Sequence, residues 1–362
     1  MARPLGLVGI MSTRRPGSFP FAEGGYFRQL MRAGRRAGVY VIAFSPLDID
    51  WSTGTVLGFT YRKGVGWRGR SYPVPRIVYD RLYPSRGMWN LYWSQVRRMR
   101  RTYRVTFMGR GLHGKWQMYR IVRRYEDLRP YLPETRLCSS VGVVIRMLEK
   151  YPVVYVKPIY GSGGKGILRI SRSPQGGYYV VGNTATRRFR TRTRSLLPIL
   201  AGINRRYLVQ QGLKLNYLNG STFDIRCIVQ RNGEGQWQVS GKAARIGRRG
   251  SITSNLHTGG GGRTVSSVLQ EWFPDRAEEL EEEIDRVALR TAEVMNRHAG
   301  PLCDLGLDLG VDVDGKVWLI EVNSKPGRRV FLYTRDREAR YRTIQTLMDY
   351  ARFLVERRRA RR

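Results

Sequence analysis

The hydrophobic pattern of the N-terminal third predicts strands that alternate with a helix. Apolar runs at residues 5–10 and 39–44 have the length of buried strands, and apolar positions recur at helical spacing over 26–37 between them. Shorter apolar runs at 55–61 and 77–79 extend the set of strands. A strand, a helix and a strand at this spacing form a βαβ unit, so we expect a parallel sheet.

The next block of the chain predicts a small α+β unit. Helical spacing over 115–125 and 139–150 precedes an apolar strand at 153–157. A glycine-rich loop and two further strands, at 166–171 and 178–181, complete the unit. We expect it to act as a lid over a binding site.

A third block predicts a larger α+β unit. Strand patterns at 207–211, 223–230 and 236–242 precede an acid-rich helical stretch at 275–298. A basic amphipathic helix is predicted at 336–358, near the end of the chain.

A β-hairpin is predicted between these two helices. Residues 306–313 and 316–323 form two strand patterns, and Asp314-Gly315 between them is a strong signal for a two-residue turn. The hairpin places residues that are far apart in sequence on neighbouring strands.

Three oxygen-bearing side chains gather on one face of this hairpin. Glu321 and Asn323 are two residues apart and therefore share a face, and the turn brings Asp308 beside them. Two carboxylates and an amide oxygen suit Mg²⁺ that is shared with nucleotide phosphates, with Mn²⁺ as the alternative ion. A solvated polar face is the other interpretation, but it would place two like charges together without benefit.

These patterns divide the chain into four segments. Residues 1–112 form an N-terminal βαβ domain, and 113–194 form a lid with a glycine-rich loop. Residues 195–335 form a C-terminal α+β domain with the metal site, and 336–362 form a basic helix and tail. The fold class is therefore α/β combined with α+β.

Composition excludes several classes of protein. The chain has 362 residues, of which 41% are hydrophobic, and this is enough for a packed core. No apolar run approaches the ~20 residues that a membrane-spanning helix needs. Cys138, Cys227 and Cys303 are far apart, so we expect no disulfide framework, no zinc site and a reducing, cytoplasmic location.

The charge balance is strongly basic. Lys and Arg number 65 against 28 Asp and Glu, which gives a formal net charge of +37. Dense basic runs occur at 97–101, 187–194 and 357–362. Such a charge attracts polyanions such as nucleic acid, acidic peptides and anionic surfaces, although a solvated surface from an arginine-rich proteome is an equal alternative.

Aromatic residues lie beside the first basic run. Trp89, Tyr92, Trp93 and Tyr103 flank residues 97–101, a combination that nucleic-acid-binding proteins use for stacking. No nucleic-acid-binding module is visible, so we interpret these rings as packing residues and expect no specific nucleic-acid partner.

A glycine-rich loop follows a lysine that ends a predicted strand. Lys157 and Pro158 precede the glycine-rich run at 161–166, where backbone N–H groups can approach phosphate oxygens closely. The run has neither the spacing of a Walker A motif nor the context of a dinucleotide-binding fingerprint. A glycine-rich hairpin turn explains it equally well when it is taken alone.

A second glycine-rich loop spans residues 253–262. It contains Ser254 and Asn255 and ends in four consecutive glycines, which can wrap an anion or simply form a mobile loop. The histidines at 113, 257 and 298 are scattered and are interpreted as surface or packing residues.

The order of these motifs resembles the ATP-grasp superfamily. The motifs that carry the resemblance are Lys157-Pro, the glycine loop, Asp224-Ile-Arg226, Ser254-Asn-Leu-His-Thr-Gly-Gly, Asp308 and Glu321-Val-Asn-Ser-Lys-Pro-Gly. Lys115-Trp-Gln-Met-Tyr, Tyr131-Leu-Pro-Glu-Thr and the stretch 207–327 look most like the YheC/YheD group of endospore coat-associated proteins. The resemblance covers about residues 110–330 and implies an ATP-grasp fold with a preceding βαβ domain.

The resemblance implies a set of nucleotide-binding residues. Lys115 and Lys157 match lysines that contact phosphates, and the segment Val209-Gln-Gln-Gly-Leu213 matches a hinge that binds adenine through its backbone. Gln210 departs from the Glu that is frequent at this hinge. The implied cofactor-binding set comprises Lys115, Lys157, Gly161, Gly163, Gly164, Gln210, Gln211, Leu213, Asp224, Ser254 and Asn255.

The resemblance also implies catalytic and metal-binding roles. Lys157, Arg226 and Arg245 are expected to stabilise the reacting phosphoryl group. Asp308, Glu321 and Asn323 match the metal ligands, and the spacing favours Asp308 over Asp312.

The implied activity is that of an ATP- and Mg²⁺-dependent ligase. Such an enzyme phosphorylates a carboxylate and lets an amine displace the phosphate, which forms a C–N bond. The expected partners are ATP, an unidentified acid and amine, and an acidic peptide or polymer on the developing spore. The expected location is the mother-cell cytoplasm, with spore-coat association. A non-catalytic, ATP-binding structural protein of the spore coat is the alternative function.

Overall fold

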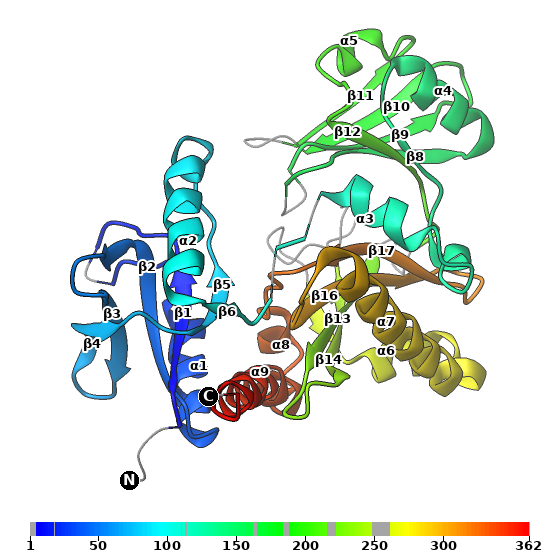
Figure 1. Cartoon of the computed structure of the whole chain (residues 1–362). Helices are drawn as coiled ribbons and strands as arrows, with labels where there is room; N and C mark the ends of the chain where they lie inside the picture. The colour runs from blue at the N-terminus through cyan, green and yellow to red at the C-terminus, as the bar shows by residue number, and fades with distance from the viewer. Residues whose placement is uncertain are drawn as a thin grey trace.

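The computed structural model describes residues 5–17, 19–109, 111–112, 114–161, 165–183, 188–215, 222–247 and 261–361. Within these residues the strands form three main sheets, each packed against helices (Figure 1). One sheet is mainly parallel and the other two are antiparallel. The expected combination of α/β and α+β architecture is therefore confirmed.

The N-terminal sheet contains the predicted βαβ unit. Strands β2, β1, β5 and β6 run parallel, and the antiparallel pair β3 and β4 extends the sheet beyond β2. In spatial order its members are β4 (Gly66–Pro73), β3 (Thr55–Arg62), β2 (Tyr40–Asp50), β1 (Leu7–Ser12), β5 (Ile77–Arg81) and β6 (Thr106–Phe107).

Helices cover both faces of this sheet. Helix α2 (Trp89–Tyr103), which follows the short turn η1 (Arg86–Met88), packs on one face. Helix α1 (Gly24–Arg36) and the C-terminal helix α9 (Arg337–Arg359) pack on the other. Leu347 in α9 is fully buried within that second layer.

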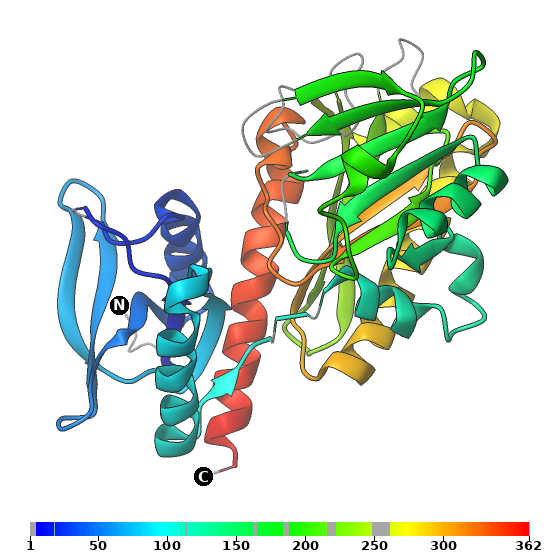
Figure 2. The same ribbon diagram turned by 90° about the horizontal axis from the view of Figure 1, so that it is seen from above.

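Helix α9 joins the N-terminal domain to the rest of the chain. It packs against α1 on one side and against two strands of the C-terminal sheet on the other (Figures 1 and 2). Its apolar residues Ile344, Met348 and Val355 complete the N-terminal core, because the sheet needs a second helix to cover this face.

The lid sheet is antiparallel throughout. Helix α4 (Val141–Lys150) packs against it, and the single turn α5 (Leu197–Leu200) adds apolar residues to the same core. In spatial order its strands are β11 (Arg188–Thr193), β10 (Tyr178–Asn183), β9 (Ile167–Arg172), β8 (Val153–Pro158), β12 (Tyr207–Gln211) and β7 (Thr135–Leu137).

The C-terminal sheet contains the predicted hairpin, formed by β16 and β17. Helices α3 (Lys115–Val122), α6 (Val265–Trp272) and α7 (Ala277–Ala299) contribute to its core. Tyr131 of the turn η2 (Arg129–Tyr131) packs against this core, and the turn η4 (Pro274–Arg276) connects α6 to α7. The short helix α8 (Val330–Tyr333) follows the hairpin. The strands, in spatial order, are β15 (Gly261–Arg263), β14 (Trp237–Ile246), β13 (Phe223–Arg231), β16 (Asp304–Val311) and β17 (Val317–Asn323).

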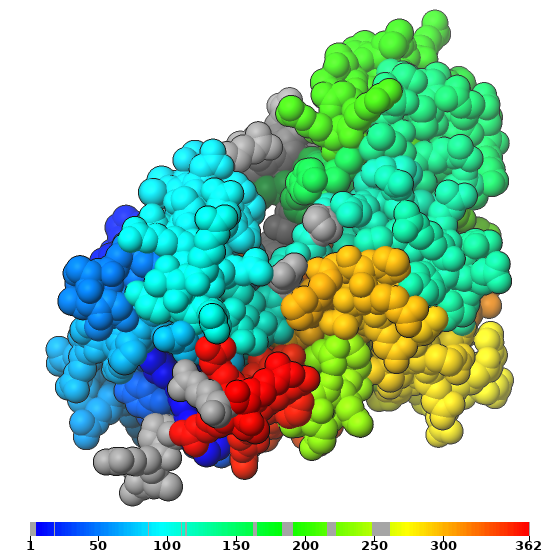
Figure 3. All heavy atoms as spheres, viewed as in Figure 1, coloured from blue at the N-terminus to red at the C-terminus, as the bar shows by residue number. Residues whose placement is uncertain are grey.

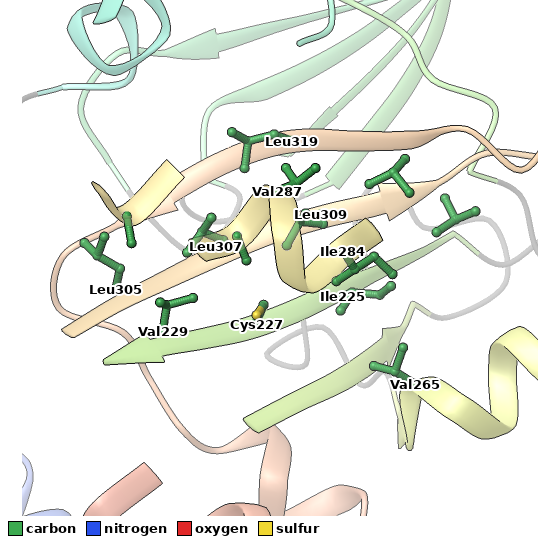
Figure 4. Packing of buried hydrophobic residues seen from close by; sticks show 14 of the residues in the cluster. Ile225, Cys227, Val229, Val265, Ile284, Val287, Leu305, Leu307, Leu309 and Leu319 are labelled. Carbon is green, nitrogen blue, oxygen red and sulfur yellow. The ribbon is translucent and has the colours of Figure 1, made fainter. Parts of the chain in front are cut away.

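Alternation along these strands separates an apolar face from a charged face. Cys227 on β13 and Leu307 and Leu309 on β16 pack under Ile284 and Val287 of α7 (Figure 4). The residues between them in sequence point to the opposite face, because successive side chains alternate along a strand. That opposite face therefore carries the polar side chains of the hairpin.

Sequence segments and packed units do not share the same limits. Residues Tyr207–Gln211 follow the lid segment in sequence but lie inside the lid sheet between β8 and β7. Helix α3 precedes the lid sheet but packs on the C-terminal core through Met118 and Val122. A search of the described residues finds no helix long and apolar enough to cross a membrane.

Candidate functional site

A recess lies between the lid sheet and the C-terminal sheet. Strands β8, β12 and β7 form one wall, and helix α3 and strand β17 form the other. Its empty space measures about 470 Å³, part of which is open to solvent. The apolar lining includes Met118, Val122, Leu132, Leu208 and Leu319, and the polar lining includes Lys115, Thr135, Lys157, Gln210 and Glu321.

Lys157 enters the recess from strand β8. Only 8% of Lys157 is exposed, and its ammonium group donates to the side-chain oxygen of Gln210 at 2.6 Å. The amide nitrogen of Gln210 donates in turn to Thr135 Oγ1 at 2.8 Å. This chain of bonds fixes the lysine on the lid wall of the recess.

Burial makes Lys157 unusually acidic. Removal from water lowers the pKa of Lys157 to about 8, against an opposing effect of the Glu321 carboxylate and a further lowering by Lys115. A buried ammonium with a single neutral acceptor would gain from an anion placed beside it. The lid wall is therefore suited to a phosphate group.

Lys115 connects the two walls. It begins helix α3, and its ammonium group donates to the carbonyl oxygen of Gly161 at 2.8 Å. The same nitrogen lies 3.4 Å from Glu321 Oε1 on strand β17. Lys115 thus touches both the start of the glycine-rich loop and the hairpin carboxylate.

The hairpin turn differs from the predicted two-residue turn. Val311 pairs with Val317, the Asp312 N–H donates to the Lys316 carbonyl, and the Lys316 N–H donates to Asp312 Oδ1, so three residues form the loop. Gly315 ends it at φ 75°, a conformation that favours glycine. A three-residue loop alone would shift the pairing by one residue from the expected register.

A β-bulge restores the expected pairing. The register shifts between Asp308 and Leu309, and Ile320 is the extra residue on strand β17. As a result Asp308 lies directly opposite Glu321, and Gly306 lies opposite Asn323. Without the bulge, Glu321 would face Leu307 and the apolar core, because a one-residue slip moves a side chain to the other face.

Two arginines bind the carboxylate of Asp308. Arg226 Nε donates to Asp308 Oδ1 at 2.7 Å, and Arg245 Nη2 lies 3.0 Å from Asp308 Oδ2. Arg245 also binds Asp224 through two bonds of 2.5 Å. These residues form a buried row of alternating charge across β14, β13 and β16.

Neighbouring charges favour the ionised forms of Asp308 and Arg245. Burial would raise the pKa of Asp308, but the guanidinium groups of Arg226 and Arg245 outweigh it and hold that pKa below its ordinary value. Burial would lower the pKa of Arg245, but Asp224 and Asp308 raise it. The sheet therefore presents the positive charge of Arg245 beside the ionised carboxylate of Asp308.

Comparison with known protein families shows to which family the chain belongs. A family model described as YheC/D like ATP-grasp matches residues 104–354, which include both walls of the recess and the whole hairpin. The chain belongs to this family. The resemblance deduced from the sequence motifs is confirmed.

Two YheC/D relatives from Bacillus subtilis (strain 168) are similar over most of the chain. Endospore coat-associated protein YheD is 30% identical over 342 residues, covering 91% of this chain and 74% of YheD. Endospore coat-associated protein YheC is 27% identical over 334 residues, covering 90% of each chain.

Solved structures with the same fold include several ligases. D-cycloserine synthetase DcsG superposes with a TM-score of 0.58 at 13% identity, covering 97% of this chain and 99% of DcsG. The D-alanine-D-alanine ligase from Coxiella burnetii gives 0.50 at 13% identity, covering 98% of both chains. At this identity the likeness establishes the ATP-grasp fold, which confirms the expected architecture.

The hairpin offers this YheC/D-like chain a donor set for a divalent ion. Asp308 and Glu321 supply carboxylate oxygens on adjacent strands, and Asn323 lies two residues beyond Glu321 on the same face. In the described part of the chain, no three His, Cys, Asp or Glu side chains cluster in a way that could hold a metal. Two carboxylates with an amide fit Mg²⁺ when phosphate and water oxygens complete the shell.

The hinge segment of the YheC/D-like fold begins in β12, an interior strand of the lid sheet. Strand β12 pairs with β7 along one edge and β8 along the other, and the N–H groups of Gln211 and Gly212 donate to Glu134 and Val153. Gln211 also accepts a bond from the Glu134 N–H. Leu213, half-buried, is the first hinge residue beyond these sheet bonds.

Several expected site residues lie outside the described residues. These are Gly163, Gly164, Ser254 and Asn255. Gly161 is described at φ 137°. The roles of these five residues in binding stay predictions from the sequence.

The structure gives a role to Lys325, a residue of the 321–327 motif to which the resemblance assigned none. Lys325, two residues beyond Asn323, donates to Asp80 Oδ1 and to the carbonyl of Leu82, both at 2.9 Å. Tyr83 donates to the Lys325 carbonyl at 3.2 Å. The loop after the hairpin is thus fastened to the carboxyl end of β5, and no local sequence signal marks a contact across 245 residues.

A second buried link joins the same two domains. Arg328 donates twice to Asp304 at 2.7 and 2.8 Å, and Asp304 accepts a further bond from Tyr79 at 2.7 Å. Only 2% of Asp304 is exposed. This link fixes the N-terminal domain beside strand β16 and so beside Asp308.

Proposed function

We propose that the chain is an ATP- and Mg²⁺-dependent ligase that joins a carboxylate to an amine through an acylphosphate. The observation that carries the proposal is the recess between two walls of opposite character. Lys157 supplies positive charge from the lid wall, and the paired carboxylates Asp308 and Glu321 face it from strands β16 and β17. Lys115 of helix α3 adds a second positive charge between the two walls. A triphosphate with a divalent ion is complementary to both walls.

The apolar part of the recess suits the base of the nucleotide. Met118, Val122, Leu132, Leu208 and Leu319 line it, and apolar walls favour a flat aromatic ring. In this proposal the backbone of Leu213 and the residues after it would bind the edge of adenine, since the preceding N–H groups serve the sheet. Gln210 would act indirectly, by holding Lys157.

The phosphoryl transfer needs charge more than covalent chemistry. The γ-phosphoryl group would move from ATP to a carboxylate oxygen of the substrate, which breaks the bond to the β-phosphate oxygen and releases ADP. Lys157, Arg226 and Arg245 would stabilise the negative charge that spreads over the phosphoryl oxygens. Mg²⁺ held by Asp308, Glu321 and Asn323 would neutralise part of that charge.

The second step forms the amide. The amine attacks the acyl carbon, the new C–N bond forms as the C–O bond to phosphate breaks, and the amine proton leaves to solvent or phosphate. Inorganic phosphate is the leaving group. The fixed charges of the Arg226 and Arg245 row would hold this product phosphate until the amide has formed.

The names of the two relatives point to a location for this protein. Both Bacillus subtilis relatives are named endospore coat-associated proteins, and we extend a spore-coat location, with an acidic peptide or polymer as substrate or partner, to this chain. The net charge of +37 supports an acidic partner, because opposite charges raise the rate and strength of association.

The proposal is tested by product analysis. The chain is incubated with Mg-ATP and a panel of amino acids and short peptides, and mass spectrometry searches for products lighter by one water than the sum of the two substrates. Glu321→Gln should lower ADP release by about a hundredfold or more, because it removes a metal ligand. Asp314→Asn, in the exposed turn of the same hairpin, is the matched control and should leave turnover unchanged.

A negative result would separate the ligase from a protein that only binds ATP. If ATP binds tightly but no panel member or sporulating-cell extract yields a product or ADP, the ligase proposal is overturned in favour of a non-catalytic ATP-binding coat protein.

A further inference from the structure

Two basic runs that are far apart in the sequence meet on one surface. Arg358, near the end of helix α9, donates to the carbonyl oxygen of Arg104 at 3.0 Å and lies 3.4 Å from Thr106 Oγ1. Arg104 follows the last turn of helix α2, and Thr106 begins the edge strand β6. In Figure 2, β6 runs between the C-terminal ends of α2 and α9.

We call this surface the arginine patch. Its members belong to helix α2, the loop before β5 and the end of helix α9, and they surround the β6 edge of the N-terminal sheet. They are Arg76, Arg97, Arg98, Arg100, Arg101, Arg104, Arg357, Arg358 and Arg359.

Five arginines of the patch have no acidic partner in the described part of the chain. No Asp or Glu occurs between Asp80 and Glu126 in the sequence, and none occurs after Glu356. Arg97, Arg98, Arg100, Arg101 and Arg104 have no carboxylate within 4.0 Å among the described residues. Glu356, which precedes the arginines at the end of α9, pairs with the exposed Arg352 at 2.8 Å. The positive charge of these five arginines is therefore available to an external anion.

The patch is separate from the recess between the lid and C-terminal sheets. Helix α9 has 23 residues and starts beside the C-terminal sheet, where it packs on β14. At a rise of 1.5 Å per residue, helix α9 is about 34 Å long, so its last turn lies about that far from its start. The patch therefore lies on the N-terminal domain, and none of its arginines lines the recess.

Aromatic rings in the patch are already covered. The guanidinium group of Arg98 lies 4.2 Å above Trp51, and that of Arg76 lies 5.5 Å above Tyr103. Trp51 and Tyr103 also stack on each other, with centroids 6.0 Å apart. Proteins that bind single-stranded nucleic acid need open ring faces for the bases. The covered rings favour an anionic chain that is bound through its charges alone.

We propose that the arginine patch docks a carboxylate-rich peptide. Arginine suits this partner, because its planar fork binds a carboxylate through two parallel bonds. Bound there, an acidic polymer keeps a high local concentration near the recess, and an extended segment of about ten residues spans the length of helix α9. This inference deepens the proposed function by naming a docking surface for the acidic partner, but docking itself requires no ATP.

Binding without nucleotide tests the inference. Fluorescence anisotropy measures the affinity of the full chain for a labelled poly-L-glutamate peptide over a series of salt concentrations. We expect affinity to fall steeply as salt rises. The triple variant Arg97→Gln, Arg98→Gln, Arg101→Gln should weaken binding about tenfold at roughly 0.1 M salt and flatten the salt dependence.

A charge-matched variant provides the control. Arg194→Gln, Arg205→Gln, Arg206→Gln removes the same number of exposed arginines from the lid, and it should change the affinity less than twofold, as expected for distant, screened charges. An equal loss of affinity in both triple variants would overturn docking at the patch, because it would mean that the peptide is attracted to the whole surface. Circular dichroism of each variant confirms that it is folded.

Two further outcomes concern the binding of nucleic acid and the result of the ligase test. A single-stranded oligonucleotide could bind more tightly than poly-L-glutamate and lose affinity in the patch variant. That result would overturn the peptide proposal and assign the patch to nucleic acid. Since no ATP is present, failure of the ligase test leaves this result intact. Failure of docking likewise leaves the ligase test intact.

Discussion

Asp308 and Glu321 face each other across the β16–β17 hairpin because one extra residue, Ile320, corrects the register set by the turn. The three-residue loop that ends at Gly315 moves the pairing by one position, and the bulge moves it back. Bulges next to functional sites re-aim side chains in this way. Here the bulge turns Glu321 from the apolar core toward the recess, where Lys115 lies 3.4 Å away.

The affinity for ATP should fall as the pH rises through the pKa of Lys157. Burial lowers that pKa to about 8, so the ammonium is charged below this pH and neutral above it. Phosphate binds the charged form, and we expect about tenfold weaker ATP binding at pH about 9.5 than at pH about 7.5. Calorimetric titration measures the difference.

Lys157→Arg is the control for this titration, because arginine stays charged over the whole range. Its affinity should not depend on pH in this interval. An identical pH dependence in the variant and the original chain would show that another group is responsible.

Gln210→Glu should move the same titration to higher pH. The new carboxylate would lie where the Gln210 oxygen now accepts from Lys157 at 2.6 Å, and a nearby negative charge raises the pKa of an ammonium. We expect the midpoint to rise by about one pH unit or more. Gln211→Glu, whose side chain accepts from Glu134 instead, should leave the midpoint in place.

Arg328→Met should destabilise the fold. Arg328 and Asp304 are both buried, and removal of the guanidinium leaves a buried carboxylate without its main partner. The expected loss in the free energy of unfolding is about 3 kcal/mol or more, measured by urea denaturation. Adding Asp304→Asn should recover part of the loss.

Arg352→Met removes one partner of an exposed pair and serves as the comparison. Its effect on unfolding should be small, because water and salt screen such pairs. Comparable destabilisation by both variants would contradict a special role for the buried pair.

Lys325→Met should separate turnover from nucleotide binding. The Lys325 side chain fastens the loop after Asn323 to Asp80 and Leu82 of the N-terminal domain. Its loss should lower ligase turnover about tenfold through misplacement of the reacting groups, while the Kd for ATP stays the same. Lys316→Met, at the exposed hairpin turn, is the control. A weakened Kd with unchanged turnover would contradict this positioning role.

The sequence predicts local elements well because their signals are local. The βαβ unit, the strands at 153–158 and 207–211, and the hairpin all follow from apolar periodicity and turn residues. Helix α2 and strand β11 are not in the prediction, because arginine runs obscure their patterns. The basic run at 187–194 includes a strand that pairs with β10.

Long-range contacts explain what the sequence could not predict. The pairing of Lys325 with Asp80, and of Tyr79 with Asp304, depends on how two domains pack, and the sequence around Asp80 and Tyr79 carries no signal for either contact. Spacing alone predicts that Asp308 lies near Glu321. It does not predict that a longer loop and a bulge compensate each other, nor that Arg226 and Arg245 bind Asp308.

The most direct test of the account is Mn²⁺ binding in the presence of a non-hydrolysable ATP analogue, measured by electron paramagnetic resonance. The account predicts that the original chain and Asp314→Asn bind Mn²⁺ with nucleotide, and that Glu321→Gln weakens this binding about tenfold or more. Unchanged Mn²⁺ and nucleotide binding in Glu321→Gln would contradict a nucleotide site between Lys157 and the hairpin carboxylates.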